Sequence, residues 1–267
     1  WKTDGVEKDI ISATSDVGRV HLFSVASQYN AAEAPSPFTP PIGRAMTESE
    51  YDHTQGPLAQ RTNPIVFEMV NAFLTNLGFN MMEYALPSAG KTYSKRSPIE
   101  HGYLTPTDET IDELAVDIIT NFQKLEVPCY ESRPSRSGES VYLMLGAAPA
   151  IGYSHNLKTS KKSCKNLQYW AYLANFTAQF KQTLALLTKY PEKEVVYHVT
   201  GTGLGVFGCS SFAFATAFQK AATMFRNVLN EEDRGRVYVQ SECYGGQGLL
   251  SKVAADLDLG DRKPRVE

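Results

Sequence analysis

The sequence lacks the cysteine spacing of a zinc site or of a disulfide framework. Its four cysteines lie far apart, with no C-x-x-C pair and no histidine at zinc-ligand spacing: Cys129, Cys164, Cys209 and Cys243. This spread favours free, mostly buried thiols in a cytoplasmic protein, and we expect no bound metal. No apolar run approaches the roughly 20 residues that span a bilayer, so we expect no membrane partner.

An excess of basic charge is absent as well. The 267 residues include 26 Lys and Arg against 29 Asp and Glu, which gives a formal net charge of -3. No chain-wide electrostatic attraction therefore favours nucleic acid as a partner. A hydrophobic content of 42% over this length is enough for one large core, and we interpret residues 1–267 as a single domain.

What the sequence does contain is an alternation of short β-branched runs with amphipathic helices. Strands are predicted at residues 20–26, 141–145, 195–199 and 236–240, and helices at residues 64–77, 107–125, 166–190 and 211–229. Alternating strands and helices predict an α/β domain with a mostly parallel sheet covered on both faces. His21 and His198 fall within apolar strands and are interpreted as buried histidines with polar partners.

One loop has the composition of a phosphate-binding turn. It joins the strand at residues 195–199 to the next helix and consists of Gly201, Thr202, Gly203, Leu204, Gly205, Val206, Phe207 and Gly208. Glycines let the backbone approach a ligand closely, and a helix start offers unpaired N–H groups to phosphates. We expect the N–H groups from Gly203 to Gly208 to hold a diphosphate. The alternative is a glycine-rich turn needed only for tight packing.

Residues 203–208 also match the G-x-G-x-x-G pattern of dinucleotide-binding folds, with Glu242 as the candidate ribose-binding acid. Glu242 lies 34 residues beyond Gly208, whereas about 20 are expected in such folds. A Walker A loop is excluded because no Lys-Ser or Lys-Thr pair follows the glycines. An NAD(P)-dependent oxidoreductase is therefore the less favoured alternative.

Two further segments gather amide, hydroxyl and carboxylate groups. The first, residues 27–33, contains Gln28, Asn30 and Glu33, and the second, residues 51–57, contains Asp52, Thr54, Gln55 and Gly56. Fixed polar loops of this kind often carry binding or catalytic residues. By chemistry alone, a capped turn explains either segment equally well.

Taken in order, these three motifs resemble the macrodomain superfamily, in particular its divergent MavL-like branch of bacterial effectors. The strand before Asn30 resembles the macrodomain strand whose asparagine contacts the distal ribose, and residues 200–208 resemble the diphosphate loop. The segment from Asp52 to Pro57 is similar to a motif of that branch. The likeness covers residues 20–63 and 194–240, and it implies a three-layer α/β/α fold with a mixed, mostly parallel central sheet.

The resemblance also implies a ligand, ADP-ribose, and an activity: hydrolysis, without metal or cofactor, of the N-glycosidic bond to an ADP-ribosylated protein, with arginine as the expected attachment residue. Asp52 is then the expected catalytic group that orients or deprotonates water, assisted by Glu33. The ligand site would comprise the glycine loop together with Gln28, Asn30, Thr54, Gln55 and Gly56.

Two points stay open within this interpretation. Phe207 either flanks the proximal ribose or plugs the core. A module that binds ADP-ribose without turnover is the first alternative to a hydrolase. The expected location is the cytoplasm, which for a secreted bacterial effector is the host cytosol.

Overall fold

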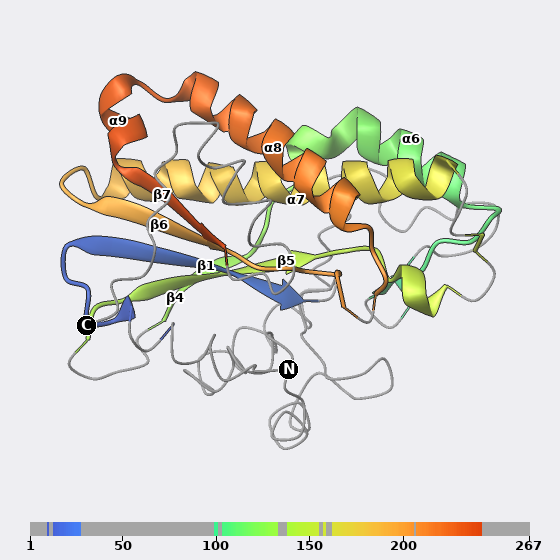
Figure 1. Cartoon of the computed structure of the whole chain (residues 1–267), viewed down its shortest axis with the longest axis horizontal. Coiled ribbons are helices and arrows are strands. Elements are labelled where there is room, and N and C mark those ends of the chain that lie inside the picture. The colour runs from blue at the N-terminus through green and yellow to red at the C-terminus, as the bar shows by residue number, and fades with distance from the viewer. Residues whose placement is uncertain are drawn as a thin grey trace, which may run out of the picture.

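The computed structural model describes Ile10 and residues 13–27, 99–100, 103–132, 138–154, 157–158, 162–205 and 207–241. At its centre is a five-stranded sheet with the strand order β4-β5-β1-β6-β7 (Figure 1). The strands are β1 (Arg19–Ser27), β4 (Cys129–Ser132), β5 (Val141–Ala147), β6 (Glu194–Val199) and β7 (Val237–Ser241). Because β1, β5, β6 and β7 are parallel and β4 is antiparallel, the predicted α/β class with a mixed, mostly parallel sheet is confirmed.

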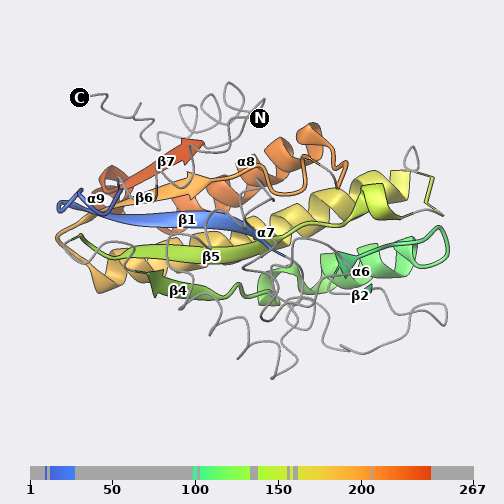
Figure 2. The same ribbon diagram turned by 90° about the horizontal axis from the view of Figure 1, so that it is seen from below.

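The long helices lie together over one face of this sheet. They are α6 (Ile111–Asn121), α7 (Lys162–Lys189) and α8 (Ser211–Val228). Helix α7 lies between the other two and runs along the strands, as Figure 2 shows from the sheet side. The helix predicted at residues 64–77 lies outside the described residues, and the third layer of the expected fold remains a prediction.

Shorter elements complete the described part of the chain. They are β2 (Ile99–Glu100), β3 (Tyr103–Leu104), the 3-10 turns η1 (Phe122–Lys124) and η2 (Ile151–Tyr153), and α9 (Glu231–Gly235). Strands β2 and β3 pair antiparallel as a separate two-stranded unit. The strand β4 and this small unit are elements that the hydrophobic periodicity does not predict.

Strand alternation divides the apolar side chains between two buried clusters. Val20 and Leu22 of β1 pack with the helices, whereas Phe23 and Val25 belong to a cluster on the opposite face. The second cluster also contains Ile10, Ala13, Val141, Leu143 and Leu145. The central strands are therefore buried on both faces, as the sequence predicts for parallel strands.

Aromatic rings fill the space between α7 and α8. Phe176 meets Phe214 and Phe218 edge to face, with ring centroids 5.0 and 5.2 Å apart. Phe180 stacks on Phe225 at 4.7 Å. Such pairs stabilise a fold by about 0.5–1.5 kcal/mol beyond the area they bury. Phe176 and Phe180 of the long helix are therefore core residues.

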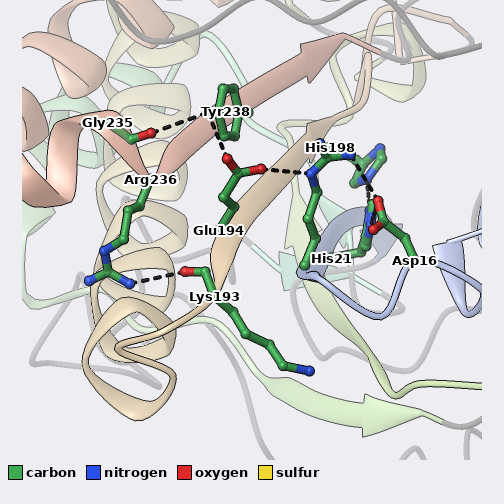
Figure 3. A network of polar contacts seen from close by, with 9 residues as sticks. Asp16, His21, Lys193, Glu194, His198, Gly235, Arg236 and Tyr238 are labelled. Atoms are coloured by element: carbon green, nitrogen blue, oxygen red, sulfur yellow. Dashed lines mark hydrogen bonds and ion pairs between the residues drawn. The ribbon is translucent and has the colours of Figure 1, made fainter.

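Two histidines join the central strands on the face opposite the helices. His21 of β1 and His198 of β6 are 7% and 3% exposed, and His21 Nδ1 lies 2.9 Å from His198 Nε2. The other ring nitrogen of His21 lies 3.3 Å from a carboxylate oxygen of Asp16 (Figure 3). The expectation of buried histidines with polar partners is confirmed.

The same network continues to the edge strand. Arg19 donates to Asp16 at 2.9 Å and to Glu194 at 2.7 Å, and Tyr238 of β7 donates to Glu194 at 3.0 Å. Burial, together with the positive charge that His198 carries when protonated, lowers the pKa of His21 to about 4. The folded state therefore favours the neutral form of His21.

We expect His21 to make the fold less stable in acid. Its pKa is about 4 in the folded state and near 6.5 when unfolded, so the unfolded chain takes up the proton first as the pH falls. The contribution is complete above pH 6.5 and is lost toward pH 4, which amounts to about 2 kcal/mol between pH 7.5 and 5.0. Urea unfolding at both pH values measures it. If His21→Gln, which does not titrate, shows the same loss as the wild type, another group is responsible.

Candidate functional site

The carboxyl ends of the parallel strands bring two loops together at one edge of the sheet. One loop follows β5 and contains η2, and the other follows β6 and leads into α8. The amide of Gly152 donates to the carbonyl of Phe207 at 2.7 Å, and the thiol of Cys209 donates to the carbonyl of Pro149 at 3.1 Å. Ligands of open α/β sheets bind at this kind of edge.

The predicted site residues are divided between described and undescribed parts of the chain. The glycine loop is described at Gly201, Thr202, Gly203, Leu204, Gly205, Phe207 and Gly208. The residues outside the described ranges are Gln28, Asn30, Glu33, Asp52, Thr54, Gln55, Gly56 and Val206. Strand β1 lies between β5 and β6 and ends at Ser27, which pairs with Ala147 at the end of β5, so the described structure brings the end of β1 and the glycine loop to the same edge.

The glycine loop is a compact turn that uses several of its own amides. Leu204 donates to the carbonyl of Gly201, Gly208 to that of Gly205, and Cys209 to that of Gly203, each at 3.0 Å. The N–H groups of Leu204 and Gly208 therefore already have partners inside the loop, and the expected diphosphate contacts fall to its other amides.

Other amides remain available at this edge. Those of Gly203, Gly205 and Phe207 donate no hydrogen bond to any residue that the structure describes. The first-turn amides of α8 at Ser211 and Phe212 likewise have no partner within the described ranges, whereas Ala213 donates to the N-cap hydroxyl of Ser210. Unpaired N–H groups beside a helix start attract an anion through both hydrogen bonding and the helix dipole.

Two glycines in the loop differ in the space that is available for a side chain. Gly203 has a φ of +81°, and a Cβ there would lie 2.5 Å from Ala148 Cβ and 2.8 Å from the Tyr172 hydroxyl. Gly205 is exposed, and a Cβ on it would have no described neighbour within 4 Å. Gly203 is therefore required by the turn, and Gly205 leaves its amide on an open surface.

Phe207 packs in a group of three aromatic rings. Its ring meets Tyr103 of β3 and Tyr153 of η2 nearly edge on, with centroids 5.6 and 5.5 Å apart, and the two tyrosines are 5.6 Å from each other. This group joins the glycine loop to the loop after β5 and to the β2–β3 unit. The geometry favours the packing role of Phe207 over a free position beside a sugar.

No charged side chain lies within the loop itself. The sequence from Thr200 to Ser210 contains no acidic or basic residue, so the loop's own side chains neither repel nor attract an anion, which would rely on backbone dipoles. Burial raises the pKa of the Cys209 thiol to about 12, which keeps it protonated and rules it out as a nucleophile. Within the described residues no group of three or more His, Cys, Asp or Glu side chains is arranged to hold a metal ion.

The sequence analysis did not identify the residues of α7 that hydrogen-bond to this loop. Gln168 and Tyr172 of α7 hydrogen-bond to the two ends of the loop, at Ser210 and Thr202 respectively. Their spacing of four residues places them on one helix face. The sequence nevertheless contains a signal for them. Polar side chains recur every three or four residues on one side of this otherwise apolar helix, and such a line indicates specific hydrogen-bond partners: Gln168, Tyr172, Asn175, Gln179 and Thr183.

Comparison with known proteins assigns no family. No protein-family description matches this sequence, and no curated protein matches it significantly. None of the described helices has the length and apolar character needed to cross a membrane. The resemblance to macrodomains therefore rests on the three motifs alone.

We expect Gly203→Ala to destabilise the fold by about 2–4 kcal/mol, because it combines a positive φ with overpacking against Ala148 and Tyr172. Gly205→Ala, the matched variant two residues away, should change the unfolding free energy by less than about 0.5 kcal/mol. Urea unfolding of both variants measures the difference. Equal stabilities would show that the turn does not require glycine at position 203.

Proposed function

We propose that this chain binds ADP-ribose at the carboxyl edge of the sheet, with the diphosphate against the glycine loop and the start of α8. The observation that carries the proposal is a set of amides without a partner among the described residues, at Gly203, Gly205 and Phe207, next to the N-terminus of an 18-residue helix. A diphosphate is the part of a nucleotide that such an arrangement recognises best. The resemblance of the motifs to macrodomains selects ADP-ribose among the nucleotides.

The surroundings of the loop support a ligand that carries two phosphates. The loop has no acidic residue, and Gly205 leaves room for close approach. Strand β1 ends at Ser27 at the same edge, and Gln28 and Asn30 follow it in the sequence. Polar side chains at this position would contact the ribose next to the diphosphate.

We further propose that the bound ADP-ribose is released from a modified protein, with arginine as the attachment residue. Cleavage of this bond passes through an oxocarbenium-like state, so water must be positioned at the anomeric carbon by a carboxylate. Water adds to that carbon as the C–N bond breaks, and the proton it loses passes to the departing guanidine. Asp52 and Glu33 are the proposed carboxylates, on the basis of the motif resemblance.

A NAD(P)-dependent oxidoreductase is the competing function that one observation favours. Strand β7 lies next to β6 in parallel, and Glu242 follows its last residue directly, where a ribose-binding acid would stand. Calorimetry with ADP-ribose, NAD and NADP separates the two functions. Tighter binding of NADP or NAD than of ADP-ribose would favour the oxidoreductase.

The first prediction of the proposal concerns Gly205. We expect the wild type to bind ADP-ribose with a Kd of about 1 μM or tighter. Gly205→Val should weaken binding by at least about tenfold without changing stability, because the side chain fills the approach to the amides rather than the core. Titration calorimetry measures Kd, and thermal unfolding checks the fold.

The matched control is Gly18→Val. A Cβ on Gly18 would also have no described neighbour within 4 Å, but this glycine lies in the turn before β1, at the opposite edge of the sheet. The control should bind ADP-ribose like the wild type. An unchanged affinity in Gly205→Val would remove the loop from the binding site.

The second prediction concerns Asp52. Asp52→Ala should lose on the order of 10²-fold or more in rate, the usual scale for a positioned acid or base, while its affinity for ADP-ribose changes far less. A group that acts on the attacking water stabilises the transition state more than the bound ground state. The test compares single-turnover release of ADP-ribose from a protein modified on arginine with equilibrium binding.

Glu33→Ala is measured alongside, and the exposed Asp112→Ala of α6 is the matched control, expected to behave as the wild type. If binding and turnover of Asp52→Ala fall by the same factor, Asp52 grips the ligand and does not act on water. If the wild type binds ADP-ribose without any turnover, the chain is a non-catalytic ADP-ribose-binding module and not a hydrolase.

A further inference from the structure

Helix α7 buries a line of polar side chains against the sheet. The residues are 0–5% exposed and follow one another at intervals of three or four along one face: Gln168, Tyr172, Asn175, Gln179 and Thr183. Burying a polar group is unfavourable unless it finds a hydrogen-bond partner. The partners of this line therefore show what the polar residues are for.

The first two residues hold the two ends of the glycine loop. The Tyr172 hydroxyl donates to the carbonyl of Thr202 at 2.8 Å, and the side-chain carbonyl of Gln168 accepts from the amide of Ser210 at 2.7 Å. Gln168 also donates through its amide nitrogen to the sulfur of Cys164 at 3.2 Å, which fixes the orientation of its side chain. The loop is thus held at both ends by residues one helical turn apart.

The next two residues of the line bond to the strands of the sheet, Asn175 at the end of β5 and Gln179 within β1 and β6. Asn175 donates to the carbonyl of Ala147, the last residue of β5. Gln179 donates to the Ser24 hydroxyl of β1 at 3.1 Å and accepts from the Tyr197 hydroxyl of β6. Helix α7 is consequently connected to β1, β5 and β6, but only Gln168 and Tyr172 bond to the glycine loop itself.

Tyr172 also determines the shape of the turn. A Cβ on Gly203 would lie 2.8 Å from its hydroxyl, so the loop backbone packs directly on this oxygen. Cys209, at the other side of the turn, is buried and donates to Pro149. The hydroxyl group is therefore one of the contacts that keep Cys209 inside and the amides of Gly203 and Gly205 in place.

We propose that Tyr172 and Gln168 are positioning residues that hold the glycine loop in the one conformation able to present its available amides to a ligand. The effect on ligand affinity rests on the proposed function. The effect on the loop does not, because the reactivity of the Cys209 thiol reports the loop conformation without any ligand.

The test removes the hydroxyl and keeps the ring. Tyr172→Phe retains the packing of this ring on Phe176 and Phe214 but leaves the Thr202 carbonyl without its partner. If the loop then holds the competent conformation about one tenth of the time, ADP-ribose binds about tenfold more weakly. Labelling of Cys209 by a thiol reagent, followed by mass spectrometry of the peptides, should become more than about tenfold faster, because the open fraction of the loop rises from below one tenth to about nine tenths.

Tyr197→Phe is the matched control. It removes an equally buried tyrosine hydroxyl that bonds to the same face of α7, but away from the loop. We expect it to lower the unfolding free energy as Tyr172→Phe does while leaving the Kd and Cys209 labelling at wild-type values. Cys129, in the distant edge strand β4, is the internal control for global opening.

The outcomes are separable. Equal Cys209 labelling in Tyr172→Phe and the wild type, or a parallel rise at Cys129, overturns the proposal, since the hydroxyl is then dispensable or only stabilises the whole fold. Gln168→Ala, which releases the other end of the loop, must give the same selective rise at Cys209 and decides the question if Tyr172→Phe fails to fold. If the wild type does not bind ADP-ribose but both variants expose Cys209 selectively, the proposed function fails and the positioning role stands.

Discussion

The arrangement of the loops at the carboxyl ends of the strands depends on the hydrogen bonds between α7 and the sheet. A helix that packs along buried parallel strands would normally present only apolar side chains to them. Here the buried face of α7 also carries amide and hydroxyl groups, which are costly to bury without hydrogen-bond partners; within the described residues only the side-chain oxygen of Asn175 in this line has none. The partners are backbone and side-chain groups of β1, β5, β6 and the glycine loop, so the helix cannot shift along the sheet without breaking several of them at once.

Apolar packing around α7 offsets the cost of burying this line of polar side chains. The rings of Phe176 and Phe180 pack on those of α8, and the helix-facing side chains of the strands close the same cluster. The opposite face of β1 and β5 is buried as well, in a cluster of its own. Apolar burial therefore dominates the energetics of the domain, and hydrogen bonding selects where each strand end and each loop lies.

The sequence predicts the regular elements well, because their hydrophobic periods are long and clear. The expected strand at residues 195–199 and the following helix correspond to β6 and α8, with ends that differ by one residue. Strand β4 could not be predicted, since its pattern is short and half-exposed and its pairing with β5 depends on tertiary contacts. The position of β1 between β5 and β6 likewise follows from contacts far apart in sequence.

Composition predicts the glycine loop as a site but does not predict its internal hydrogen bonds. Whether an amide such as that of Leu204 points to a ligand or to Gly201 is decided by local backbone angles, which composition does not determine. The helical spacing predicts Tyr172 only as an aromatic core residue, although its hydroxyl is the part that contacts the loop. A tyrosine has an apolar ring and a polar hydroxyl group, and a hydrophobic pattern detects only the ring.

The anchoring of the glycine loop at Thr202 and Ser210 has a consequence for its length. The two anchors on α7 are four residues apart, a rise of about 6 Å along the helix, and this fixes the distance that the loop must bridge. At Gly205, near the tip, no described residue lies close enough to limit the size of a side chain. We therefore expect the loop to tolerate insertions and deletions only at the tip, where a longer segment would widen the opening over the available amides and alter which ligands fit, while the two ends and the sheet beneath them stay unchanged.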